Sequence, residues 1–302
     1  MVSLVLTLLA AMVQPVSASD IPATGHYHHY VALGDSYAAG PGIPIQYGTP
    51  AGCGRSSRNY PSLLASALRV ARFTDVSCGG ATTANMTAPE QMSDGTNAPQ
   101  FAALTRDTDL VTLTVGGNDI GFSEIVSTCG ALAATQPAGD PCQRHFTSGG
   151  TDELAARVVA VAPLIKNVII GIRRRAPRAI IMVVGAPRIL PSTGGCYPSV
   201  PFATGDTPYL NRIQGLLNSV TGQQARATGA LFVDSYGLSY GHDACEPAGQ
   251  RWVEGLQPQS PAAPLHPNAE GMAAVAAFCR VALVHSGRIA SAHRAGDTRP
   301  VS

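Results

Sequence analysis

Charged residues are scarce in this chain of 302 residues. They make up only 13% of the sequence, the formal net charge is +1, and Lys166 is the only lysine. A chain without a basic or acidic excess has little attraction for nucleic acid or an acidic membrane surface, so neither is expected as a partner. The sequence also lacks a Cys-x-x-Cys pair, a glycine-rich phosphate loop and a helix with spaced metal ligands. Nothing therefore supports a metal site or a cofactor, and none is predicted.

Long apolar runs are also few, and the first lies at the amino terminus. It ends in small residues at Ala18, the pattern that precedes a signal-peptide cleavage site, although no Lys or Arg comes before it. The run is shorter than the roughly 20 residues that a membrane span requires. We therefore predict a signal peptide over 1–18, a mature domain over 19–286 and a polar tail over 287–302. The expected protein is a secreted, extracellular monomer, free or associated with the cell wall, without stable insertion into the membrane.

Seven cysteines lie in the predicted mature chain. In an oxidising compartment six of them would pair, in one of many connectivities. The simplest arrangement pairs neighbours along the chain, namely Cys53–Cys78, Cys129–Cys142 and Cys196–Cys245. Cys279 differs because it lies at helical spacing from Met272 and Val275 in an apolar segment. We expect it to be a buried free thiol.

Apolar, β-branched segments alternate with helical patterns along the mature chain. This alternation is typical of a parallel sheet with helices on both faces, so we predict an α/β fold with three α/β/α layers. The expected strands lie near 30–36, 72–78, 109–119 (where the strand ends in a tight turn), 178–187 and 230–235, and the expected helices near 60–70, 151–177, 208–227 and 266–284. Residues 119–150 are expected to form a loop insertion, and Thr151 to cap the helix that follows. Chemistry in such sheets gathers at the carboxyl ends of the strands.

Four short motifs carry groups that suit acyl transfer. GDS places Ser36 at the end of the first strand, and a serine attacks esters when a base takes its proton. GGATT offers the backbone N–H of Gly80, and GGND offers the amide of Asn118, as donors to an oxyanion. HPN places His266, a candidate base, directly before a helix.

Each motif alone has a plainer interpretation as a turn or a helix cap. A competing nucleophile is Ser239 in GLSYG, which fits the Gly-x-Ser-x-Gly elbow. The elbow must enter a helix at once, and the Pro and Gly that follow Ser239 disfavour this. The histidines of the amino-terminal arm, His26, His28 and His29, only superficially suggest metal binding.

Taken together and in this order, the four motifs resemble the SGNH hydrolases, also called the GDSL esterase/lipase family. The resemblance extends from about Tyr30 to Val284. The segments YVALGDSYAAGPG, CGGATT and PLHPNAEG, with six loop cysteines, resemble more narrowly its secreted actinobacterial branch with three disulfides. It implies a flavodoxin-like sandwich, a serine esterase or lipase activity and no cofactor.

The resemblance also implies a role for each motif residue. Ser36 would be the nucleophile and His266 the base. The oxyanion donors would be the backbone N–H groups of Ser36 and Gly80 and the side chain of Asn118.

One position departs from the usual pattern. Many family members carry an Asp three residues before the histidine, where this chain has Ala263. We predict that the backbone carbonyl of Ala263 or a near neighbour orients His266. A carboxylate from Glu254 or Asp243 is the alternative.

The substrate is expected to be a small-molecule or lipid ester, first among them a carboxylic ester of a fatty acid. A carbohydrate O-acyl ester or a phospholipid is the second candidate. An amidase or peptidase with the same nucleophile, and a binding protein that retains only the fold, are the remaining alternatives.

Overall fold

A five-stranded parallel sheet organises the chain. The computed structural model describes residues 27–295, with side chains up to Gly287, so the predicted signal peptide lies outside the described residues. The strands lie in the order β2-β1-β5-β6-β7, and every neighbouring pair is parallel. Their bounds are β1 His29–Gly34, β2 Arg72–Asp75, β5 Leu110–Thr114, β6 Ile180–Val184 and β7 Leu231–Val233.

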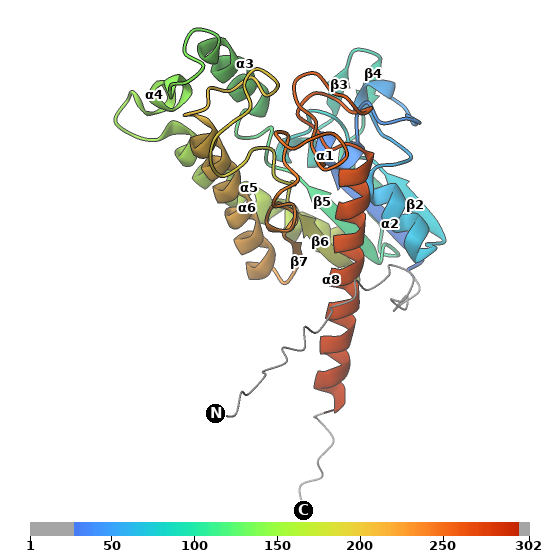
Figure 1. The fold of residues 1–302 in the computed structure, drawn as a ribbon. Coiled ribbons are helices and arrows are strands. Elements are labelled where there is room, and N and C mark those ends of the chain that lie inside the picture. The colour runs from blue at the N-terminus through green and yellow to red at the C-terminus, as the bar shows by residue number, and fades with distance from the viewer. Residues whose placement is uncertain (1–26, 296–302) are drawn as a thin grey trace, which may run out of the picture.

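Helices cover both faces of this sheet (Figure 1). Val31 and Leu33 of β1 pack in one core with α5 and α6, whereas Tyr30 and Ala32 pack in the other with α2 and α8. Because both faces of the strands are buried, they read as continuous apolar runs. The predicted three-layer α/β/α fold is confirmed. The helix bounds are α2 Tyr60–Leu68, α5 Glu153–Arg175, α6 Thr207–Ala227 and α8 Ala269–Ala295.

The strand order places a crevice beside β1. Numbered along the chain, the order is 2-1-3-4-5, the flavodoxin-like arrangement, which reverses direction between β1 and β5. The chain leaves β1 toward the face covered by α2 and leaves β5 toward the face covered by α5. Ligands of such sheets bind at this switch point, outside the carboxyl ends of the strands.

Several local predictions are wrong. Residues 119–150 contain two helices, α3 (Phe122–Ala133) and α4 (Pro141–Thr147), instead of a loop insertion. The buried side chains of α3 recur every fourth residue, at Ile125, Cys129 and Ala133, a short helical period that the surrounding Gly and Pro concealed. Asp152, not Thr151, caps α5, because its carboxylate accepts the N–H of Ala155.

One hairpin was not predicted, and the last helix is longer than expected. A two-stranded antiparallel hairpin, β3 (Glu90–Met92) and β4 (Gly95–Asn97), lies outside the main sheet. The last helix continues to Ala295, so the boundary expected at 286 falls within α8. α5 and the part of α8 up to Gly287 are long and apolar enough to span a membrane, but both pack against the sheet as core helices.

Three disulfides tie loops to this framework, and they are the expected ones: Cys53–Cys78, Cys129–Cys142 and Cys196–Cys245. Cys279 is buried and free, as predicted, and burial raises the pKa of its thiol far above the ordinary value. The first disulfide joins the segment after α1 to the segment after β2, and the third joins the segments that follow β6 and β7.

Candidate active site

Ser36 lies at the point where β1 turns into the short helix α1 (Ser36–Ala39). The turn needs a glycine at Gly34, because φ is +145° and a Cβ there would meet the carbonyl oxygen of Thr114 at 2.5 Å. The buried Gln100 side chain bonds both the N–H and the C=O of Gly34, at 2.8 and 2.9 Å. Asp35 caps α1 through the N–H of Tyr37. Ser36 is thereby fixed at the carboxyl edge of the sheet.

His266 reaches Ser36 from the loop before α8. Its Nε2 lies 2.7 Å from the Oγ of Ser36, and its Nδ1 lies 2.8 Å from the carbonyl oxygen of Pro264. A carbonyl oxygen only accepts, so Nδ1 carries the proton and donates it to Pro264. The neutral ring then offers the lone pair of Nε2 to the Ser36 hydroxyl, which is the arrangement that general-base catalysis requires.

The carbonyl that holds the imidazole is therefore that of Pro264, a near neighbour of Ala263, and not that of Ala263 itself. The Ala263 carbonyl already accepts the backbone N–H of His266, at 3.2 Å. Leu265 lies between Pro264 and His266 and adopts a left-handed conformation, with φ of 59°. This turn leaves the next carbonyl, that of Pro264, facing the ring.

Neither alternative carboxylate bonds His266. The Glu254 carboxylate accepts from Asn268 Nδ2 at 2.8 Å and from the Gln259 N–H at 3.0 Å. Asp243 accepts the N–H of Cys245. Glu254 supports the loop in another way, because its backbone N–H donates to the carbonyl of His266 at 3.0 Å.

The candidate oxyanion donors come from three strand ends. Asn118 donates from Nδ2 to the carbonyl of Ala81 at 3.0 Å, which fixes the amide beside the Gly80 loop and leaves its second N–H for a ligand. Asp119 joins the same two loops, since it accepts from the N–H and hydroxyl of Thr83. In the part of the chain that the structure describes, the N–H groups of Ser36 and Gly80 have no hydrogen-bond partner.

Two aromatic rings enclose the imidazole. Tyr37 lies 5.0 Å from it and Phe122 lies edge-on at 6.0 Å, measured between ring centroids. Burial by such neighbours disfavours the imidazolium and lowers the pKa of His266, an effect that the Pro264 carbonyl partly offsets. The ring is thus held neutral, in the form that accepts a proton.

This shift predicts the pH dependence of the reaction. A base with a lowered pKa stays unprotonated to lower pH, so we expect kcat/KM for a neutral soluble ester to fall only below about pH 6.5, the ordinary pKa of histidine. Burial raises the pKa of Asp35, the carboxyl group beside Ser36, to about 7. The profile is therefore repeated with Asp35→Asn, which retains a cap acceptor. A limb that disappears in this variant would belong to Asp35 and contradict the prediction.

Tyr37 is a candidate positioning residue. Its buried hydroxyl donates to the carbonyl of Leu265 at 2.6 Å, one residue before His266, so it anchors the strained turn. We expect Tyr37→Phe to lower kcat by about 10- to 100-fold with little change in KM, since small misplacements of reacting groups are costly. Tyr47→Phe is the matched control, because it removes a hydroxyl bonded to Asp75 on the surface. A Tyr37→Phe enzyme that is less stable but keeps its kcat unchanged would contradict this role.

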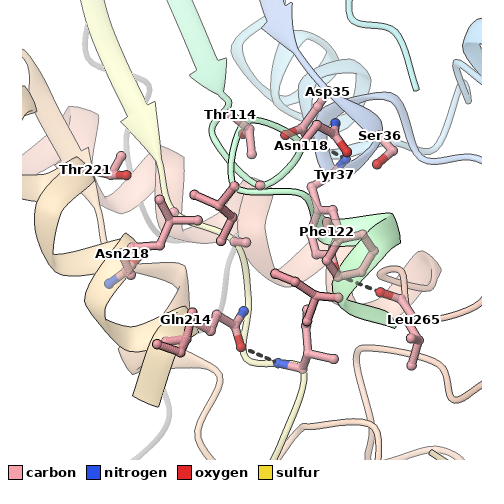
Figure 2. A pocket seen from close by; sticks show the side chains of 18 of the residues that line it. Asp35, Ser36, Tyr37, Thr114, Asn118, Phe122, Gln214, Asn218, Thr221 and Leu265 are labelled. Atoms are coloured by element: carbon pink, nitrogen blue, oxygen red, sulfur yellow. Dashed lines mark hydrogen bonds between the residues drawn. The ribbon is translucent and has the colours of Figure 1, made fainter. Parts of the chain in front are cut away.

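A mostly apolar pocket extends from Ser36 into the protein. Figure 2 shows Asp35, Ser36 and Asn118 at one end, and Asn218 and Thr221 of α6 at the other. The part of the pocket between these ends is lined by aliphatic and aromatic side chains from the strand ends, α3, α6 and the intervening loops, among them Val115, Ile125, Val184, Leu190, Phe202 and Ile213. Such a channel suits an extended hydrocarbon group.

The other sequence candidates are occupied elsewhere. The buried Ser239 accepts the N–H of Arg188 at 2.7 Å and donates to the carbonyl of Tyr236, so it is bound to backbone groups rather than to a base. His29 is buried in β1, not exposed in an arm, and contacts Arg72, Thr74 and Thr108. Sequence reasoning assigned no role to Tyr37, Asp119 or Phe122. Tyr37 directly follows GDS, Asp119 is the last residue of GGND, and Phe122 lies three residues beyond it.

Comparison with known proteins agrees with this geometry. Residues 32–274 match the GDSL-like Lipase/Acylhydrolase family, and the chain belongs to that family. It is a carboxylic ester hydrolase of the SGNH type.

The chain is also similar to individual proteins. The chain is similar to Lipase 2 of Streptomyces coelicolor, with 43% identity over 249 residues that cover 80% of this chain and 81% of the relative. Among solved structures it is similar to phospholipase A1 from Streptomyces albidoflavus, at 28% identity and a TM-score of 0.68, covering 84% of this chain and 98% of that one. The extracellular lipase of Streptomyces rimosus gives 28% identity and a TM-score of 0.67, covering 82% and 97%.

Proposed function

We propose that this protein is a secreted lipase that cleaves fatty-acyl esters through a Ser36–His266 dyad. The observation that carries the proposal is the 2.7 Å contact between Ser36 Oγ and His266 Nε2, with Nδ1 held by a backbone carbonyl. A dyad of this kind needs no carboxylate, because the carbonyl fixes both the tautomer and the orientation of the ring.

The acylation step follows from these contacts. His266 Nε2 takes the hydroxyl proton as Ser36 Oγ attacks the ester carbonyl carbon, and the carbonyl oxygen becomes an oxyanion. The N–H groups of Ser36 and Gly80 and the free N–H of Asn118 donate to it. His266 then gives its proton to the departing alkoxide, and an acyl-Ser36 ester remains.

Deacylation reverses the roles. His266 takes a proton from water, the hydroxide attacks the acyl carbon, and the same donors stabilise the second oxyanion. The proton returns to Ser36 Oγ as the fatty acid leaves. Because burial lowers the pKa of His266, the protonated ring gives its proton to the leaving group more readily than an exposed imidazolium would in both steps.

The pocket supports a fatty-acyl group rather than an acetyl group as the acid part of the substrate. Its apolar lining continues from Ser36 to Thr221 on α6, well beyond the space that an acetyl group fills (Figure 2). Several relatives are named lipases, and one similar structure is named a phospholipase A1. A phospholipid is therefore the second candidate substrate.

A series of p-nitrophenyl esters of increasing chain length tests the acyl group. We expect kcat/KM to rise from acetate toward medium or long chains, and Ser36→Ala to remove activity on all of them. Thr221→Phe fills the far end of the pocket and should lower activity on palmitate while butyrate is spared, with the isosteric Thr221→Val as control. A preference for acetate, or faster cleavage of the matching anilides, would contradict the proposal.

Export is part of the proposal. It is supported by three disulfides in the described chain and by a similar protein that is named extracellular. Mass spectrometry of the protein recovered from culture medium should find Ser19 as the first residue. Recovery of the uncleaved chain from the cell pellet would contradict it.

A further inference from the structure

The three loops around His266 carry almost no charge. Residues 37–54 and 189–205 contain no Asp, Glu, Lys, Arg or His, and His266 is the only titratable side chain among residues 255–269. We call these the uncharged loops. Even in a chain with 13% charged residues, three such stretches meeting at one site form an unusual surface.

The uncharged loops are joined to one another by backbone hydrogen bonds. The N–H of Ala263 donates to the carbonyl of Pro41 at 2.8 Å, and the N–H of Leu256 donates to the carbonyl of Ser199 at 2.9 Å. Disulfides Cys53–Cys78 and Cys196–Cys245 fasten two of the loops to the body of the protein. Figure 1 shows the loop-bearing end of the molecule beside α1, away from the carboxyl-terminal end of α8.

Large apolar side chains project from these loops into solvent. Ile45 is 74% exposed, Leu256 42% and Tyr197 37%, one from each loop. The same loops also line the pocket, through Tyr37, Leu190 and Leu265 among others. The loops that carry these exposed apolar side chains are thus the same loops that line the pocket of Ser36.

We propose that the uncharged loops dock the protein on the surface of a neutral lipid-ester droplet, so that an acyl chain passes from the droplet into the pocket. This inference rests on the proposed lipase function. Exposed apolar side chains on loops that also line an apolar pocket favour a hydrophobic phase. The missing charges remove both attraction to an anionic bilayer and a desolvation cost on entry. The disulfides keep the loops ordered before contact, which reduces the entropy lost on docking.

Flotation with triolein emulsion tests docking without catalysis. Ser36→Ala is expected to float with the droplets equally at low and high salt, because no charge pairing is involved. Adding Ile45→Ser and Leu256→Ser should weaken partitioning at least tenfold. The matched control adds Val159→Ser and Leu164→Ser on α5, where the exposed fractions are similar at 64% and 45%, and should float as before.

Hydrolysis separates this inference from the lipase proposal. With Ser36 intact, Ile45→Ser/Leu256→Ser should keep its kcat/KM on dissolved p-nitrophenyl butyrate and lose activity on the emulsion. Equal flotation of the loop and α5 variants, or binding to anionic phosphatidylglycerol vesicles that salt abolishes, would overturn the docking surface. Absence of any ester hydrolysis by the intact enzyme, with flotation unchanged, would instead overturn the lipase function alone.

Discussion

Replacing His266 by alanine is expected to lower kcat on a soluble ester by about 10⁴-fold or more, the loss typical of removing the base from a serine nucleophile. Ser36 Oγ then has no acceptor for its proton, since Nε2 is the acceptor that the structure places at 2.7 Å. KM should change little, because the imidazole contributes to proton transfer more than to binding. Added imidazole should restore part of the rate by occupying the vacated space.

The same measurement decides what orients the base. Asp243→Asn should leave kcat nearly unchanged, because that carboxylate bonds the N–H of Cys245. Glu254→Gln should lower the melting temperature, since the fully buried Glu254 lies 3.4 Å from Arg251 and accepts from Asn268. The fraction of Glu254→Gln that stays folded should still hydrolyse the ester with close to the normal kcat. A thousandfold loss of kcat in either folded variant would contradict a dyad held by the Pro264 carbonyl.

The layers of the fold could be predicted because they depend on patterns that a sequence displays directly. The strands are buried on both faces, so β1, β5 and β6 appear as short, largely apolar runs, rich in β-branched residues in β5 and β6. The helices α3 and α4 could not be predicted, because each is short and lies among glycines and prolines that usually mark loops. Their stability comes from packing and from Cys129–Cys142 rather than from an evident local pattern.

The reacting side chains of the candidate site could be located because each lies in a short motif at a strand or helix end. The group that orients His266 could be predicted as a backbone carbonyl but not assigned to one residue, since the direction of a carbonyl depends on torsion angles. Leu265 at φ of 59° turns the Pro264 carbonyl toward the ring, and no sequence rule places a leucine in that conformation. Tyr37 stabilises this turn through its hydroxyl and could have been suspected as an aromatic residue directly after the serine.

The second large effect is expected at Asn118. Asn118→Ala should lower kcat by roughly 10²- to 10³-fold, as removal of one oxyanion donor typically does. KM should stay nearly constant, because the donor meets full negative charge only in the transition state. Asn167→Ala is the control, because Asn167 is an exposed asparagine on α5 remote from the motifs, and it should leave kcat and KM unchanged.

A transition-state analogue distinguishes this role from loss of structure. Asn118 also bonds the carbonyl of Ala81, so its removal could loosen the Gly80 loop and act indirectly. Asp119→Asn weakens the parallel link to Thr83 while keeping the amide of Asn118, and should cost far less. If Asn118 donates to the oxyanion, affinity for a boronic acid that forms a tetrahedral adduct on Ser36 should fall in parallel with kcat/KM. An Asn118→Ala enzyme that binds the boronic acid normally, or an Asp119→Asn enzyme that is equally impaired, would instead assign Asn118 to holding the two loops together.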